Sequence, residues 1–289
     1  MTEKILEEST NKLAGSGCKV LVPEEDRKSL KEIEKSITKR YRKRLWSKFI
    51  KAIKTYELVQ EGDKIAVAIS GGKDSMLMAK MFQELKRHSP VNFEVVYLAM
   101  DPGYHDSIRK LLEDNCEYLD IPLVTFDSQI FEVADRIASD YPCYMCARMR
   151  RGALYGKAEE LGCNKLALTM LNVLCAGNFK TMLPKLKSTN FEGIELIRPL
   201  YYIREEDIIR WMTYTGIWPL NCACMVAAKK TGNKRYEIKD LIKNLSKDFI
   251  NVEKSIFKAA ENVNVDSILG WQIDGEKHSF LERFQEDVY

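Results

Sequence analysis

The feature that most constrains the fold is an apolar segment that runs directly into a glycine-rich loop. Residues 65–69 (Ile-Ala-Val-Ala-Ile) are continuously apolar, which is typical of a strand covered on both faces. The loop after them consists of Ser70, Gly71, Gly72, Lys73, Asp74 and Ser75, and we expect a helix to begin at once. Glycines let the backbone approach a phosphate closely. A helix N-terminus supplies free N–H groups and the positive end of the helix dipole. The segment therefore predicts a strand, an anion-binding loop and a helix in succession.

The loop is not a Walker motif, in which four residues separate the first glycine from a Gly-Lys pair. A glycine-rich turn without a ligand is the alternative interpretation. The expected position between a strand and a helix favours phosphate binding, with Lys73 adding charge and the two serines adding hydroxyl groups.

Strands and helices alternate along most of the chain. Apolar runs predict further strands at residues 93–100, 123–126, 165–168 and 194–197. Helical periodicity predicts helices at residues 76–85, 105–118, 131–139, 148–161, 205–214 and 236–245. This alternation predicts an α/β fold, a mainly parallel sheet with helices on both faces. Asp101 follows the second strand at the carboxyl edge, where such sheets bind ligands.

We expect the 289 residues to form three parts. Residues 1–58 would be an N-terminal arm and a basic helix, because apolar residues recur every four positions from about residue 25 to 58. Residues 59–232 would be the α/β domain, and residues 233–289 a C-terminal helical extension.

Composition argues against a membrane protein. No stretch approaches the roughly 18–20 apolar residues that a membrane span requires. Residues 1–9 contain three glutamates and no apolar core, so they do not resemble a signal peptide. We therefore expect a cytoplasmic protein whose eight cysteines are mostly reduced.

Positive charge is concentrated between residues 39 and 54, which contain eight Lys or Arg and no acid. On one helix, Arg40, Arg44, Lys48 and Lys51 would form a positive stripe. A solvated helix face is the alternative interpretation. The stripe predicts a polyanionic partner near the N-terminal part.

Four cysteines form two close pairs, Cys143 with Cys146 and Cys222 with Cys224. A single CxxC is compatible with zinc, an iron–sulfur cluster, a redox dithiol or simple packing. The three histidines do not neighbour a cysteine, and a one-residue gap is poor zinc spacing. Three cysteines holding a [4Fe–4S] cluster fit better, although zinc and redox chemistry remain alternatives.

One joint is unusually short. The fourth predicted strand ends at Leu168, and the next apolar helical stretch begins at Met170. Strand-to-helix loops normally contain about 2–6 residues, so either the chain bends unusually here or residues are missing.

Several segments together resemble a known family. The glycine-rich loop has the SGGxDS signature of the PP-loop ATP pyrophosphatases, which adenylate a substrate while splitting ATP. Further matching segments are Gly62-Asp63-Lys64 and residues 141–152, 182–186, 197–200 and 221–222. From about residue 30 to 245, in this order, they resemble the TtcA/TtuA family of PP-loop tRNA thiolation enzymes, on the TtcA-like side of tRNA 2-thiocytidine synthetases.

This resemblance implies ATP-dependent tRNA thiolation. It implies adenylation of the C2 oxygen of a pyrimidine, with a cytidine in the anticodon loop expected, then attack by sulfur and loss of AMP. The implied cluster ligands are Cys143, Cys146 and Cys222, with one iron open for sulfur. The expected catalytic residues are Lys73, Asp74, Arg150 and Cys222, and Asp74 would help to hold Mg²⁺.

The expected ATP ligands are Ser70, Gly71, Gly72, Lys73, Asp74, Ser75 and, from its place at the sheet edge, Asp101. Arg40, Arg44 and Lys48 are expected to contact tRNA phosphates. A sulfur donor such as a cysteine desulfurase system is an expected partner, and a homodimer is a candidate assembly.

The sequence departs from the family where the joint is short. Relatives carry a Gly-His-His-x-x-Asp-type segment after the fourth strand, whereas Leu168 is followed here by Thr169 and Met170. About ten residues are missing, either as an omitted mobile loop or as a deletion that would cast doubt on catalysis. The rival functions are a PP-loop ligase or sulfurtransferase for a small molecule and a catalytically inactive tRNA-binding paralogue.

Overall fold

The computed structural model describes residues 27–104, 106–128, 130, 142–168, 182–220 and 234–282. The helix predicted at residues 131–139 and the joint after Leu168 lie outside these residues. The chain divides into two compact units, Met1–Leu171 with Leu183–Thr231, and Asn172–Met182 with Gly232–Tyr289. The three-part division stays a prediction.

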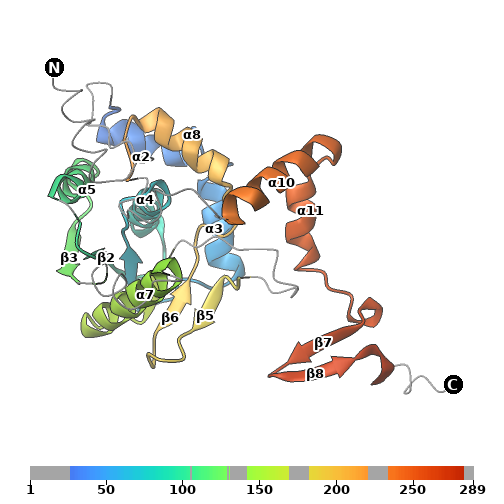
Figure 1. The fold of residues 1–289 in the computed structure, drawn as a ribbon. Helices are drawn as coiled ribbons and strands as arrows, with labels where there is room; N and C mark the ends of the chain where they lie inside the picture. The colour runs from blue at the N-terminus through green and yellow to red at the C-terminus, as the bar shows by residue number, and fades with distance from the viewer. Residues whose placement is uncertain are drawn as a thin grey trace. The chain divides into compact units, whose positions relative to one another are not determined.

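A six-stranded sheet forms the centre of the larger unit. Its strands are β1 (Lys64–Ala68), β2 (Glu94–Asp101), β3 (Leu123–Asp127), β4 (Lys165–Ala167), β5 (Lys185–Lys187) and β6 (Glu195–Ile197). They are arranged in the order β3-β2-β1-β4-β6-β5, and all neighbours are parallel except β5 with β6. The predicted mainly parallel α/β fold is confirmed, with the short strand β5 as an addition (Figure 1).

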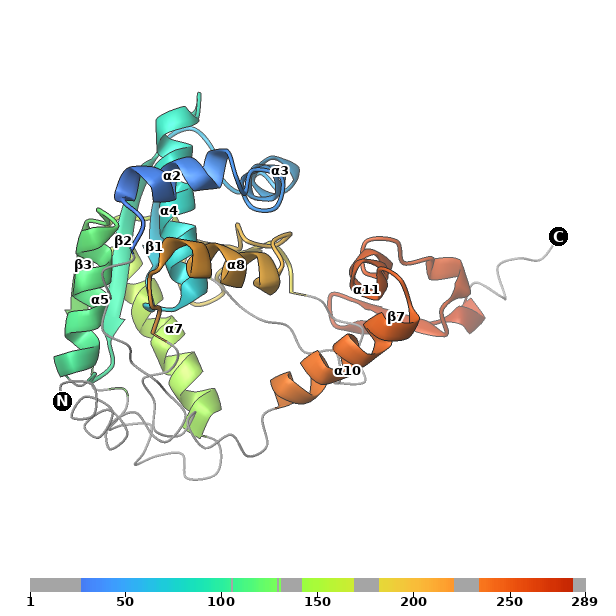
Figure 2. The same cartoon turned by 90° about the horizontal axis from the view of Figure 1, so that it is seen from above.

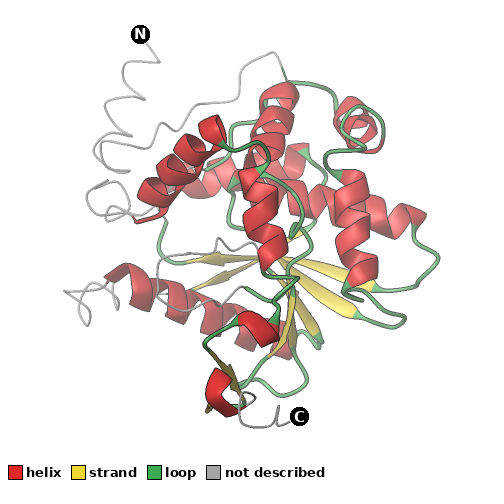
Figure 3. Ribbon diagram, turned by 90° about the vertical axis from the view of Figure 1, so that its right-hand side faces the viewer, coloured by secondary structure: helices red, strands yellow, loops and turns green. Residues whose placement is uncertain are grey.

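The sheet is covered on both faces, as its apolar strands predict (Figure 3). The helices in the described part of this unit are α2 (Leu30–Thr38), α3 (Trp46–Thr55), α4 (Lys73–His88), α5 (Asp106–Tyr118), α7 (Pro142–Glu160) and α8 (Glu205–Thr215). Along β1, Ile65 and Val67 pack into the core that contains α2, α3, α4, α5 and α8. Ala66 and Ala68 face the other core, which contains Tyr155 of α7. Successive side chains of β1 therefore serve opposite faces.

The order of the strands places a switch point between β1 and β4. The chain proceeds from β1 to β2 and β3 on one side, and β4, β6 and β5 lie on the other. Ligands of open parallel sheets bind at such a point, outside the carboxyl ends of the strands. The glycine-rich loop follows β1 at this edge and leads into α4.

The single helix predicted between residues 25 and 58 is wrong, because the chain forms two helices with a turn at residues 39–45 (Figure 2). Ser29 starts α2 with a capping box that includes Glu32. An exact four-residue spacing drifts by about 40° per step around a helix. One straight helix therefore cannot keep Ile33 and Ile53 against the same surface. The turn changes the direction of the chain. As a result Tyr41, Leu45 and the apolar face of α3 are all buried.

The described part of the smaller unit comprises α10 (Lys234–Asp248), α11 (Val252–Ala259), η1 (Val265–Ser267), β7 (Gly270–Ile273) and β8 (Glu276–Ser279). Helix α10 confirms the helix predicted at residues 236–245. The antiparallel β7–β8 hairpin was not predicted, although Asp274-Gly275 between its strands is a typical hairpin turn. None of the helices in the described parts of the chain has both the length and the apolar character needed to cross a membrane.

Candidate functional site: the phosphate loop and its surroundings

The glycine-rich loop has the geometry of an anion-binding site. Gly71 adopts φ +77°, a left-handed conformation that glycine tolerates best, and Gly72 is the N-cap of α4. The backbone N–H groups of Lys73 and Asp74 have no acceptor among the described residues. Such first-turn N–H groups and the positive helix end attract phosphate.

The two serines shape the loop from within. Ser75 is buried, and its hydroxyl group donates to the carbonyl oxygen of Gly72 at 2.9 Å. The same hydroxyl accepts the backbone N–H of Ser70 at 3.2 Å. The side chain of Ser70 in turn accepts the N–H of Gly72 at 3.4 Å. These hydrogen bonds join residues of the loop to one another and fix its backbone conformation.

Lys73 lies between two carboxylates. Its Nζ is 3.3 Å from Asp74 Oδ2 and 3.0 Å from Glu205 Oε1. Burial opposes the charge of Lys73, but the two carboxylates outweigh burial and raise the pKa of this lysine. The ammonium group is therefore fully charged at neutral pH. Sequence reasoning missed Glu205, whose only signal was its place in the acidic start of a predicted helix.

Leu220 covers the other side of the loop. Its backbone N–H donates to the carbonyl oxygen of Gly71 at 2.8 Å, and its side chain is 9% exposed. Sequence reasoning missed this residue as well, because nothing local connects positions 71 and 220.

Asp101 lies at the carboxyl end of β2, as predicted, but its carboxylate already has partners. Oδ1 accepts the backbone N–H groups of Gly103 and Tyr104 at 2.9 and 2.7 Å. Oδ2 lies 2.6 Å from Nη2 of Arg109. Asp101 thus organises the loop after β2, and its contact with ATP stays a prediction.

Arg150 connects this edge of the sheet to α7. Its Nη2 donates to the hydroxyl oxygen of Tyr104 at 3.4 Å. Cys143 and Cys146 lie near the start of α7, earlier than the predicted start at residue 148. Cys222 and Cys224 lie outside the described residues. Within the described ranges, no three His, Cys, Asp or Glu side chains are grouped as metal ligands would be.

The predicted tRNA-binding residues do not form one helical stripe. Arg40 and Arg44 belong to the turn between α2 and α3, and only Lys48 lies on a helix. Arg44 and Lys48 approach the buried carboxylate of Asp207 in α8 at 3.6 and 3.3 Å. The guanidinium carbon of Arg40 lies 4.6 Å from the centre of the Tyr214 ring. The charges therefore also attach this turn to α8, and their role towards tRNA stays a prediction.

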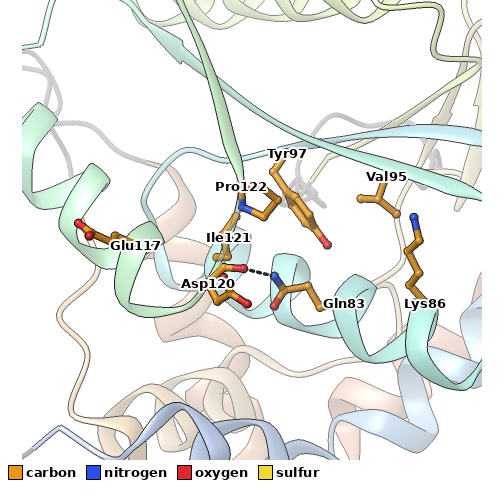
Figure 4. A pocket seen from close by; sticks show the side chains of 8 residues that line it. All are labelled: Gln83, Lys86, Val95, Tyr97, Glu117, Asp120, Ile121 and Pro122. Carbon is orange, nitrogen blue, oxygen red and sulfur yellow. Dashed lines mark hydrogen bonds between the residues drawn. The ribbon is translucent and has the colours of Figure 1, made fainter.

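A pocket of about 430 Å³ lies elsewhere (Figure 4). Its lining includes Gln83 and Lys86 from the second half of α4 and Tyr97 from β2. Gln83 donates to the carbonyl oxygen of Asp120 at 2.5 Å across one side of the pocket. None of the residues predicted to bind ATP, the cluster or tRNA lines this pocket. The pocket is therefore separate from the glycine-rich loop.

Comparison with known proteins identifies close relatives. No family model matches the sequence. The tRNA-cytidine(32) 2-sulfurtransferase of Pelobacter propionicus is 36% identical over 238 residues, covering 78% of this chain and 87% of the relative. That of Geotalea uraniireducens is 35% identical over 227 residues, covering 74% and 88%.

A solved structure has the same fold. It is the U34-tRNA thiolase NcsA from Methanococcus maripaludis with its [4Fe-4S] cluster. The TM-score is 0.60 with 22% identity, over 79% of this chain and 81% of that one.

Proposed function

Because the chain belongs to the tRNA-cytidine(32) 2-sulfurtransferase family, we propose that it replaces the C2 oxygen of cytidine 32 in tRNA with sulfur, at the expense of ATP. The observation that carries the ATP requirement is the start of α4. There, free N–H groups, a left-handed glycine and a charged lysine converge at the switch point of the sheet.

Adenylation comes first in this proposal. The C2 oxygen of the base attacks the α-phosphorus of ATP, the bond to pyrophosphate breaks, and an adenylated base results. The loop residues 70–75 hold the phosphates, and Lys73 offsets the negative charge that develops on them. Asp74 helps to hold Mg²⁺. A reactive C2 atom is inaccessible in a stacked base, so the cytidine is expected to be flipped out of the loop.

Sulfur transfer follows. Hydrosulfide attacks C2, the bond between C2 and the former base oxygen breaks, and AMP leaves with that oxygen and the electron pair. The S–H proton is released. Cys143, Cys146 and Cys222 are proposed to hold a [4Fe–4S] cluster, and the first two lie three residues apart near the start of α7. When bound, such a cluster with three protein ligands supplies an iron open to sulfur. Arg150, on the same helix, would offset the charge of the departing AMP.

The partners follow from this chemistry. tRNA is the substrate, and Arg40, Arg44 and Lys48 are proposed to contact its phosphates. A cysteine desulfurase system is the proposed sulfur donor, the cytoplasm the proposed location, and a homodimer the proposed assembly.

A catalytically inactive tRNA-binding paralogue is the second candidate. It is favoured by the joint after β4, where Leu168, Thr169 and Met170 replace the family's His-His-x-x-Asp-type segment. In that case the chain would bind tRNA without modifying it.

One experiment distinguishes the two candidates. The protein is purified anaerobically and incubated with ATP, Mg²⁺, sulfide and unmodified tRNA, and the nucleosides are analysed by mass spectrometry. We expect 2-thiocytidine that depends on ATP. A tRNA band shift without 2-thiocytidine or AMP formation would instead favour the inactive paralogue.

A further inference from the structure

The segment that leaves α8 is anchored twice before it reaches Asn221. Gly216 ends α8 in a left-handed conformation at φ 70°, which turns the chain away from the helix. The buried side chain of Asn115 in α5 then donates from Nδ2 to the carbonyl oxygen of Trp218 at 2.9 Å. Two residues later, the N–H of Leu220 donates to the carbonyl oxygen of Gly71 at 2.8 Å. Residues 216–220 are therefore attached both to α5 and to the phosphate loop.

The side chain of Leu220 occupies the space that a side chain on Gly71 would need. A β-carbon on Gly71 would lie 2.4 Å from Cδ1 and 2.8 Å from Cγ of Leu220. It would also lie 3.2 Å from Cδ1 of Leu112. The left-handed turn of the loop is thus packed against two leucines, of which Leu220 also bonds to its backbone.

From this geometry we propose that Leu220 is a positioning residue for ATP binding. It holds the Gly71 turn, and through it the free N–H groups at the start of α4, in the conformation that receives phosphate. This role rests on the proposed function and deepens it, because Leu220 packs against and bonds to the loop that is proposed to bind ATP.

The contact between Leu220 and Gly71 has a thermodynamic consequence. If the ordered loop favours ATP, then ATP must favour the anchored state of residues 216–220 to the same extent. ATP should therefore slow hydrogen exchange at the Leu220 amide, whose acceptor is Gly71. General stabilisation of the fold would instead slow exchange in all elements alike.

The test compares Leu220→Ala, Leu220→Met and Leu85→Ala in the full-length protein. Leu85 is 6% exposed in the same core, but it belongs to the last turns of α4, far from the loop. ATP affinity is measured by equilibrium binding with Mg²⁺, together with amide exchange. We expect Leu220→Ala to weaken ATP binding about tenfold and to remove the protection of residues 216–220, because small misplacements of binding groups have effects of this size or larger. Leu220→Met and Leu85→Ala should bind ATP like the parent.

Two outcomes would overturn the role of Leu220. One is parental ATP affinity in Leu220→Ala, and the other is an equal loss in Leu85→Ala, which would reveal a general stability effect. A parent protein that binds ATP but forms no 2-thiocytidine would count against the proposed function, while the affinities of the variants would still decide the role of Leu220.

Discussion

The Nζ atom of Lys73 lies 3.0 Å from Oε1 of Glu205, which joins the first residue of α4 to the first residue of α8. Both helices begin at this point, so a lysine of the phosphate loop forms an ion pair with a carboxylate from a segment more than 100 residues away. A bound triphosphate would compete with Glu205 for the same ammonium group. Glu205 is therefore, together with Asp74, a counterion of Lys73.

Removal of the loop's charged side chains should abolish ATP-dependent activity. We expect Lys73→Ala and Asp74→Ala each to lower kcat/KM by roughly a hundredfold or more, because each would remove electrostatic stabilisation in the transition state. Circular dichroism should show an intact fold. Lys86→Ala is the matched control, an exposed lysine at the other end of α4, and it should retain full activity. Parental turnover in both loop variants would contradict the assignment of the phosphate loop.

The pH dependence of stability should reveal the ion pairs of Lys73. The pKa of this lysine is higher in the folded chain than its ordinary value of 10.5. Its pairs therefore stabilise the fold fully below that value, and the contribution is lost as the pH rises through the folded pKa. In urea unfolding between about pH 6 and pH 9.5, where Glu205 is ionised, the parent should exceed Glu205→Gln by a constant free energy. The difference should shrink above about pH 10.5. A difference that grows with pH would contradict this account.

The basic turn and α3 should contribute to tRNA binding. Reversal of Arg40, Arg44 and Lys48 to Glu should weaken binding and flatten its salt dependence, because fewer counterions would be released. Reversal of Arg44 and Lys48 also places carboxylates beside Asp207, so glutamine variants of the same three positions serve as a milder comparison. Filter binding across a salt series measures both effects. Unchanged binding at every salt concentration would leave these charges with their role in attaching α8.

The cysteines should differ in iron content. After anaerobic reconstitution, Cys143→Ala, Cys146→Ala and Cys222→Ala should lose the cluster absorbance and most of the iron, because each would remove one of three ligands. Cys224→Ala should retain both, and so should Cys163→Ala, which removes a buried thiol in the core beside α7. Loss in Cys224→Ala but not in Cys222→Ala would exchange the roles of these two residues. Four equivalents of iron in Cys143→Ala would contradict the cluster altogether.

The fold class and the phosphate loop were predictable because their signals are local. The apolar run at β1, the glycines after it and the periodicity of α4 each depend on neighbouring residues, and backbone geometry converts them directly into a strand, a loop and a helix. The spacing of Cys143 and Cys146 is also a local signal, and the shared site that it predicts stays a prediction.

The break between two helices and the long-range contacts of the glycine-rich loop were decided by packing. The break between α2 and α3 depends on the surface that both helices must cover, which the four-residue spacing does not reveal. Lys73 meets Glu205, and Gly71 meets Leu220, only because the parallel sheet brings distant segments to one edge. Sequence by itself determined the strand, the glycine-rich loop and the helix that are proposed to bind phosphate. The tertiary structure decided which partners hold them in place, because such contacts depend on how helices pack and not on the order of residues along the chain.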